Sequence, residues 1–313
     1  MAWVCPMCST NNVDTDSQCI VCDTIKPEDK PGLKINSELK KINYVESNIS
    51  SDESSESEEA AEYDFAVHLM HLNPTKGFEK LLACAAGGYA VAQFRVGLEY
   101  YTGKIVSKDY AKAITWFTKA AFQGDVVAQY YLGLCHVYGD KKNYNSAFLW
   151  FTKAAEASHV GAQLYVAHCY AYGWGVEIDH VTAVSWYRKA ASDGNSTAMY
   201  YLGTAYFNGR GIEKNETKAF LYFDMAAKAG NVDAEVYLGY CYEKGCAVAV
   251  DMTRAVQHYL AAAEAGNASA QYNIGLCYKN GKGVKADRSV AIKWFSKAAA
   301  QGHKKSIAML EKI

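Results

Sequence analysis

The sequence contains little proline and no long apolar run. Only four of its 313 residues are proline, so most of the chain can form regular elements and a packed core. No segment approaches the roughly 18 consecutive apolar residues of a membrane-spanning helix. The N-terminus lacks the basic region and apolar stretch of a secretory signal. We therefore expect an intracellular protein, cytoplasmic or nuclear, without a membrane span.

The chain has almost no net charge, and only one stretch carries charges of a single sign. The formal net charge is −1, which disfavours a general nucleic-acid or polyanion binder. Residues 51–62 hold six acids and no base, which leaves the rest of the chain at +5 (−1 plus 6). Hydrophobic periodicity is absent over residues 31–62, so we predict a disordered, acidic and serine-rich linker there. Ser50 and Ser55 each precede an acid by three residues, a pattern that acidophilic kinases prefer.

Four of the ten cysteines lie together at the N-terminus, with the spacing Cys5-x2-Cys8-x10-Cys19-x2-Cys22. Two Cys-x2-Cys pairs can surround one Zn²⁺ ion tetrahedrally and leave no open position, as in structural zinc sites. Disulfide pairing is the alternative, and a reducing compartment disfavours it. We predict that residues 1–30 fold around one structural zinc ion, whose binding supplies about 10–16 kcal/mol in zinc-finger peptides.

Two further residues indicate which family of zinc fingers the cysteine pattern resembles. Trp3 stands two residues before the first cysteine and Asn12 four after the second. Over residues 3–22 the motif resembles the Ran-binding-protein-two type zinc finger. The resemblance implies that Trp3 packs against the two cysteine pairs and that Asn12 ties them together.

The same family divides mainly into binders of single-stranded RNA and binders of ubiquitin. RNA-binding members carry tryptophan and arginines after the asparagine, for stacking on bases and reading their edges, whereas residues 13–16 here are Val-Asp-Thr-Asp. Ubiquitin-binding members carry Thr-Phe after the second cysteine and an apolar residue before the fourth. Here Ser9 and Thr10 replace Thr-Phe, and Val21 keeps the apolar position. Ubiquitin or another docked protein is therefore favoured over RNA, although the lost phenyl ring weakens a small interface. A finger that binds no ligand is an equal alternative.

The remainder of the chain is a repeat with a period of 36 residues. An alanine recurs at Ala92, Ala128, Ala162, Ala198, Ala234 and Ala270, with one interval of 34 where the loop after Gly139 is two residues shorter. Each unit contains two segments with helical hydrophobic spacing. In five units a glycine lies inside the first segment, which indicates close approach of helices. In all six units another glycine follows that segment, which suits a left-handed cap. An Asp or Asn precedes the second segment and can cap its N-terminus. One helix pair cannot bury its apolar face alone, so the units are expected to stack into a solenoid.

These residues closely resemble the Sel-one-like repeat, a relative of the tetratricopeptide repeat. The signature covers about residues 78–313. The resemblance implies an all-α, right-handed solenoid in residues 63–313, about six repeats with degenerate caps at both ends. It also implies first helices on the concave side and an adaptor or scaffold role.

A row of tyrosines marks a candidate binding surface. Counting the repeated alanine as position 1, positions 4, 7 and 11 share one helix stripe. Position 4 is tyrosine in four consecutive units, namely Tyr131, Tyr165, Tyr201 and Tyr237. We predict that these residues, with Tyr138, His168 and Tyr172 of the same stripe, bind a peptide in the concave groove. The alternative is that the tyrosines pack between neighbouring helices.

No nucleophile–base pair stands out, and Cys135, Cys169, Cys241 and Cys277 share one helix position that indicates buried thiols. We therefore predict a monomeric, non-enzymatic adaptor that binds a protein or peptide partner in the groove and a protein at the finger. An RNA-associated factor is the first alternative. An enzyme of the secreted, β-lactam-binding Sel-one-like type is the second, and the missing signal and paired cysteines disfavour it.

Overall fold

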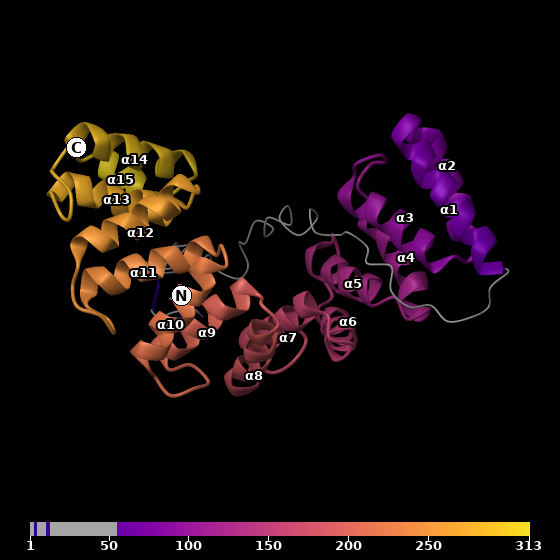
Figure 1. Ribbon diagram of the computed structural model, residues 1–313, viewed down its shortest axis with the longest axis horizontal. Helices are drawn as coiled ribbons and strands as arrows, with labels where there is room; N and C mark the ends of the chain where they lie inside the picture. The colour runs from indigo at the N-terminus through magenta and orange to yellow at the C-terminus, as the bar shows by residue number, and fades with distance from the viewer. Residues whose placement is uncertain (1–2, 5–10, 13–54) are drawn as a thin grey trace. The chain divides into compact units, whose positions relative to one another are not determined.

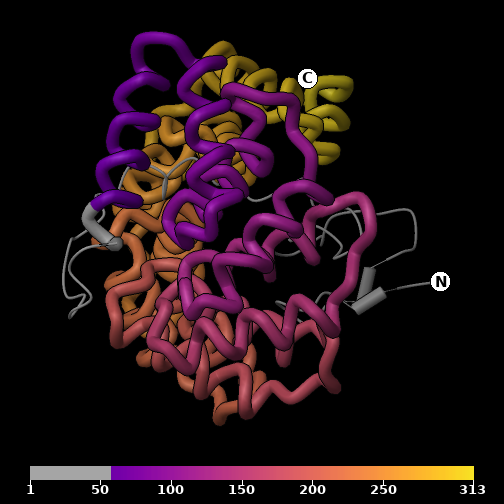
Figure 2. Tube along the Cα trace, turned by 90° about the vertical axis from the view of Figure 1, so that its right-hand side faces the viewer, coloured from indigo at the N-terminus to yellow at the C-terminus, as the bar shows by residue number. Residues whose placement is uncertain are grey.

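A computed structural model describes residues 3–4, 11–12 and 55–313, with side chains from residue 58 onward. Strands β1 (Trp3–Val4) and β2 (Asn11–Asn12) pair antiparallel, with Trp3 opposite Asn12. Residues 55–313 form helices joined by short turns (Figures 1 and 2). Their bounds are α1 (Ser55–Leu72), α2 (Pro74–Gly87), α3 (Ala90–Thr102), α4 (Tyr110–Phe122), α5 (Val126–Tyr138), α6 (Tyr144–Glu156), α7 (Val160–Tyr172), α8 (His180–Ser192), α9 (Ser196–Asn208), α10 (Glu216–Lys228), α11 (Val232–Lys244), α12 (Met252–Glu264), α13 (Ala268–Asn280), α14 (Arg288–Ala300) and α15 (Lys304–Leu310).

The helices belong to two compact units, one that ends at Ile178 and one that begins at Asp179. Within each unit, helices adjacent in the chain pack against each other in pairs. The predicted all-α architecture of stacked helix pairs is confirmed. Among the described residues, no helix is long and apolar enough to cross a membrane.

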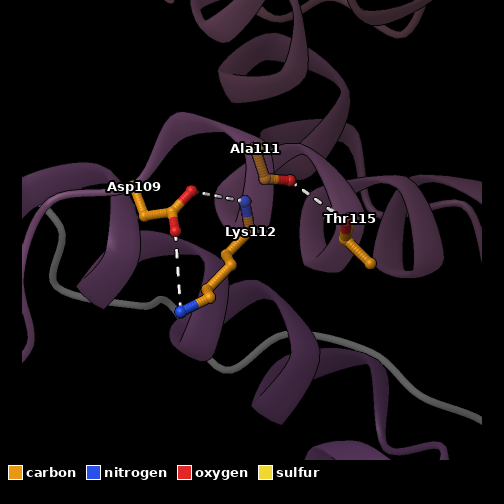
Figure 3. Close-up of polar contacts among 4 residues, drawn as sticks. All are labelled: Asp109, Ala111, Lys112 and Thr115. Carbon is orange, nitrogen blue, oxygen red and sulfur yellow. Dashed lines mark hydrogen bonds and ion pairs between the residues drawn. The ribbon is translucent and has the colours of Figure 1, made fainter.

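The second helix of every repeat begins at the predicted cap. Figure 3 shows the first example, in which Oδ1 of Asp109 accepts a hydrogen bond from the Lys112 amide at 2.9 Å. The Lys112 ammonium lies 3.6 Å from the other carboxylate oxygen, and the Thr115 hydroxyl donates to the carbonyl of Ala111. Each cap satisfies an amide that has no partner inside the helix. The same role is confirmed for Asn143, Asp179, Asn215, Asp251 and Asp287.

The predicted left-handed glycine after the first helix is confirmed in five repeats and wrong in one. Gly103, Gly173, Gly209, Gly245 and Gly281 have φ between 67° and 77°. Gly139 instead has φ −71° and ψ 169°. Its loop is two residues shorter, and the chain leaves α5 in an extended conformation toward α6.

In five of the six repeats, a glycine inside the first helix makes room for an aromatic ring of the second helix; α7 carries Ala167 at this position. A Cβ atom at any of the five positions would lie 2.5 to 2.6 Å from a ring carbon, closer than atoms can approach. The predicted close approach of the helices is therefore confirmed, and it is a contact between glycine and a ring. The pairs are Gly97 with Phe117, Gly133 with Phe151, Gly203 with Phe223, Gly239 with Tyr259, and Gly275 with Phe295.

Helix α1 begins at Ser55, so the last eight residues of the expected linker, 55–62, are helical and the predicted boundary at residue 62 is wrong. Glutamates form helices readily and are favourable near a helix N-terminus, where their charge opposes the helix dipole. The acidic run therefore enters the helix. The rest of the predicted linker, residues 31–54, lies outside the described residues.

Candidate functional site

The structure places the row of predicted tyrosines between helices. Each ring stacks on an aromatic ring of the preceding second helix, with centroids 4.7 to 5.5 Å apart. The stacked pairs are Tyr131 with Phe117, Tyr165 with Phe151, Tyr201 with Tyr187, and Tyr237 with Phe223. Three of these partner rings also fill the space beside a glycine. In three repeats the same ring therefore contacts both a glycine and a tyrosine. The rings of the four tyrosines thus pack between helices, which is the alternative to a binding role.

Exposure differs along the row. Tyr131 and Tyr165 retain only 5% and 7% of their surface, so their ring faces are not available to a peptide. Tyr201 and Tyr237 are half-buried. A binding role for the accessible parts of the four tyrosines stays a prediction.

Four of the predicted groove residues lie together in the first unit. The hydroxyls of Tyr138 and Tyr165 are 3.0 Å apart. The ring of His168 lies 5.7 Å from the rings of both Tyr165 and Tyr172. His168 is buried and Tyr172 half-buried, so only the outer edge of this cluster is accessible. Burial also raises the pKa of Tyr165 well above its usual value, which keeps the phenol neutral.

Position 11 is the accessible part of the stripe in every repeat. The residues there are half-buried or exposed, and they are Thr102, Tyr138, Tyr172, Asn208, Lys244 and Asn280. Position 7 is buried in α3, α5, α7 and α9 but accessible at Tyr240 and Leu276. The accessible surface of the first helices is therefore largest on α11 and α13.

Tyr240 is the centre of this accessible surface. Its side chain is 36% exposed, and the ring of Phe207 lies 6.0 Å away at 79°. The Lys244 ammonium is 2.8 Å from Glu243, and the other oxygen of Glu243 accepts a hydrogen bond from the Tyr259 hydroxyl at 2.9 Å. Glu243 is thus held by two partners, and it fixes Lys244 beside the ring of Tyr240. We call the accessible side chains Phe207, Asn208, Tyr240, Lys244 and Asn280 the first-helix face.

Sequence reasoning missed a polar contact between two helices of the same unit. Nδ1 of His258 lies 2.7 Å from a carboxylate oxygen of Glu235, and the imidazole stacks on Tyr242 at 5.4 Å. His258 occupies the position that is tryptophan in most other repeats. This difference was the feature of the sequence that could have indicated a polar contact here. Both side chains are about one-quarter exposed, and no nucleophile lies in the contacts of this pair.

The cysteine that recurs in the first helix is a free thiol in all four repeats that carry it. Cys135, Cys169, Cys241 and Cys277 are buried thiols, as predicted. Burial raises the pKa of Cys169 and Cys241 to about 12 and that of Cys277 to about 11, so the reactive thiolate is absent near neutral pH. Within the described residues, no group of three His, Cys, Asp or Glu side chains could hold a metal ion.

The predicted zinc ligands Cys5, Cys8, Cys19 and Cys22 lie outside the described residues, as do Ser9, Thr10 and Val21. Of Trp3 and Asn12 only the backbone is described, and their strand pairing brackets the segment that holds Cys5 and Cys8.

Comparison with known proteins identifies the repeat. The family model described as "Sel1 repeat" matches six times, at residues 90–125, 126–159, 160–195, 196–231, 232–267 and 268–303. The chain belongs to the Sel1 repeat family. Each match begins two residues before the repeated alanine, so the six predicted repeats are confirmed. No family model matches the N-terminal finger.

Two solved Sel1 structures resemble the chain along most of its length. A Sel1 repeat protein from Oxalobacter formigenes is 30% identical, with a TM-score of 0.72, over 81% of this chain and 75% of that one. A protective antigen of uropathogenic Escherichia coli is 31% identical, with a TM-score of 0.68, over 82% of this chain. The match spans 56% of the antigen's own length. No curated protein matches the chain. Sel1 repeats generally mediate protein–protein interaction, and the first-helix face has the chemistry of a binding surface.

Proposed function

We propose that this Sel1 repeat protein is a non-enzymatic adaptor that binds an extended segment of a partner protein on the first-helix face. The single observation that carries the proposal is the exposed ring of Tyr240 beside Phe207 and Lys244. Tyrosine combines a rigid apolar surface with a hydroxyl, and such residues dominate the binding energy of protein interfaces.

The flanking side chains supply polar recognition. Asn280 is exposed and offers an amide donor and an amide acceptor, which complement the two polar groups of a peptide backbone. Lys244 adds a positive charge that is half exposed. The expected ligand is a peptide in extended conformation with an apolar side chain over Tyr240.

A displayed library of random peptides tests this role. Peptides selected on the full chain are measured against Tyr240→Ala and against Leu221→Ala, a control whose side chain is 58% exposed on α10. We expect Tyr240→Ala to weaken binding roughly tenfold or more, as an interface hot spot does, and Leu221→Ala to leave it unchanged. Equal binding by both variants would place the peptide site elsewhere.

We also propose that residues 3–22 hold one structural Zn²⁺ ion through Cys5, Cys8, Cys19 and Cys22, and dock a second protein. The support is the spacing of the cysteines and the strand pairing around the first pair. Metal analysis of the purified chain should give one zinc per protein, lost in Cys5→Ser. Two modules on one chain raise avidity when both partners are linked.

Ubiquitin is the proposed finger ligand, on the basis of Ser9, Thr10 and Val21. Unlabelled full chain is added to isotope-labelled ubiquitin, and NMR shifts are compared with those from Val21→Asp. Shifts that disappear in the variant support ubiquitin, whereas an absence of shifts with the zinc-loaded wild type leaves docking of a different protein.

A further inference from the structure

The outer face of α1 carries large apolar side chains that no other described helix covers. Phe65 is 58% exposed and Leu72 is 72% exposed, and with exposed Ala61 they lie on one stripe of the helix. Terminal repeats of a solenoid normally present a polar outer face that keeps the end of the stack in solution. Helix α1, the first helix among the described residues, departs from that rule. Exposed apolar patches of this kind mark interaction sites.

Acids border this stripe. Glu58, Glu59, Glu62 and Asp64 lie on α1, and residues 55–72 contain no Lys or Arg. Within the described part of the chain, none of these four acids forms an ion pair. The stripe thus carries Phe65 and Leu72 with the exposed His68 between them, and acids lie at its margin.

The last repeat has the complementary character. Residues 268–313 hold nine Lys and Arg residues against Asp287 and Glu311, a net charge of +7, whereas residues 232–267 hold two bases and five acids, a net charge of −3. The last repeat also exposes apolar side chains, with Ile307 42% exposed on α15 and Ile292 37% exposed on α14. Lys293 and Lys312 are exposed as well.

We propose that the α1 face of one copy binds the basic last repeat of a second copy, so that the chain associates head to tail and is not the monomer expected from its sequence. Apolar contact between Phe65 or Leu72 and Ile307 supplies affinity, and the opposite charges steer and orient the two ends. Because two different surfaces meet, each copy keeps one free end. Such a contact builds a ring if the rotation closes and an open series if it does not. The proposal does not depend on the first-helix face.

Sedimentation of the full chain tests the association directly. We expect the mean mass to rise with protein concentration at low salt, and to fall toward the monomer at high salt, since the Debye length shrinks from ~10 Å at 0.1 M to ~3 Å at 1 M. A head-blocked variant (Phe65→Asp with Leu72→Asp) and a tail-blocked variant (Ile307→Asp) should each stay monomeric. Leu221→Asp, equally exposed at 58% on α10, should associate as the wild type does.

Mixing the two blocked variants gives the decisive result. The head-blocked chain keeps its basic end and the tail-blocked chain keeps its acidic end, so a one-to-one mixture should form a dimer and no larger species. Dimers of the tail-blocked variant alone would show a head-to-head contact and overturn the proposal. A wild-type chain that stays monomeric at every concentration would also overturn the proposal. That conclusion would hold even if a different protein were found to bind α1. Circular dichroism of each variant shows whether it is folded, so a loss of association through unfolding is recognised.

Discussion

Replacement of Gly203 by alanine should destabilise the chain, although alanine is the better helix former. The added Cβ would lie 2.6 Å from two ring carbons of Phe223 and 3.3 Å from the Ala219 carbonyl. Carbon atoms pack best at about 3.5–4.0 Å, so the ring would have to move by about 1 Å. The ring is also stacked on Tyr237, with centroids 4.7 Å apart, and Phe223 is fully buried. The ring therefore has little room to retreat.

Two opposing terms set the size of this effect. Overpacking of a core costs about 1–3 kcal/mol, and the change from glycine to alanine inside a helix gains about 1 kcal/mol. We expect a net loss of up to about 2 kcal/mol in the free energy of unfolding. At about 2–4 °C per kcal/mol, the melting temperature should fall by up to about 8 °C.

Thermal and urea unfolding followed by circular dichroism measure the change. Gly87→Ala is the matched control, because it lies at the exposed end of α2, where a Cβ would meet no atom within 4 Å. This control should be neutral or stabilising. Replacing Phe223 by leucine in the Gly203→Ala background should recover part of the loss, and a double-mutant cycle gives the coupling between the two sites. If Gly203→Ala raised stability as much as Gly87→Ala does, the packing argument for the repeated glycine would be refuted.

Three more predictions concern single positions. Ser158 has φ 65° where the other repeats carry glycine, so Ser158→Gly should raise the melting temperature, because a left-handed conformation costs other residues about 1–2 kcal/mol; no change would mean that the loop holds no strain. Burial lowers the pKa of His159, whose Nδ1 accepts a hydrogen bond from the Ala162 amide. His159 therefore binds more protons in the unfolded chain than in the folded one. Its contribution to folding stability is present above pH ~6.5 and is lost as the pH falls below that value. In His159→Asn, the fall in melting temperature between pH 7.5 and pH 5 should be smaller than in the wild type. An equal fall in both proteins would show that His159 does not cause the pH dependence. Removal of zinc with a chelator should unfold residues 1–30 and leave the melting of the repeats unchanged, and a shift in that melting would contradict independent folding.

The sequence alone determined the repeat, the helix pairs and their caps. These features depend on local relations: hydrophobic spacing along one helix, and an Asp or Asn side chain that reaches an amide two or three residues later, as at Asp109 and Asp179. Such contacts form whenever the segment is helical, so the pattern of residues is sufficient to predict them.

The tertiary structure decided which side chains of the stripe are accessible. Tyr131 and Tyr237 occupy the same position of their repeats, yet the first is buried and the second half-buried, because neighbouring helices bring different side chains against them. The ring contact of Tyr240 with Phe207 and the polar contact of His258 with Glu235 also arise between helices. These contacts join residues 23 to 33 positions apart, beyond the reach of any periodicity within one helix. Local pattern therefore fixed the scaffold, and only the packing of one repeat on the next determined its binding surface.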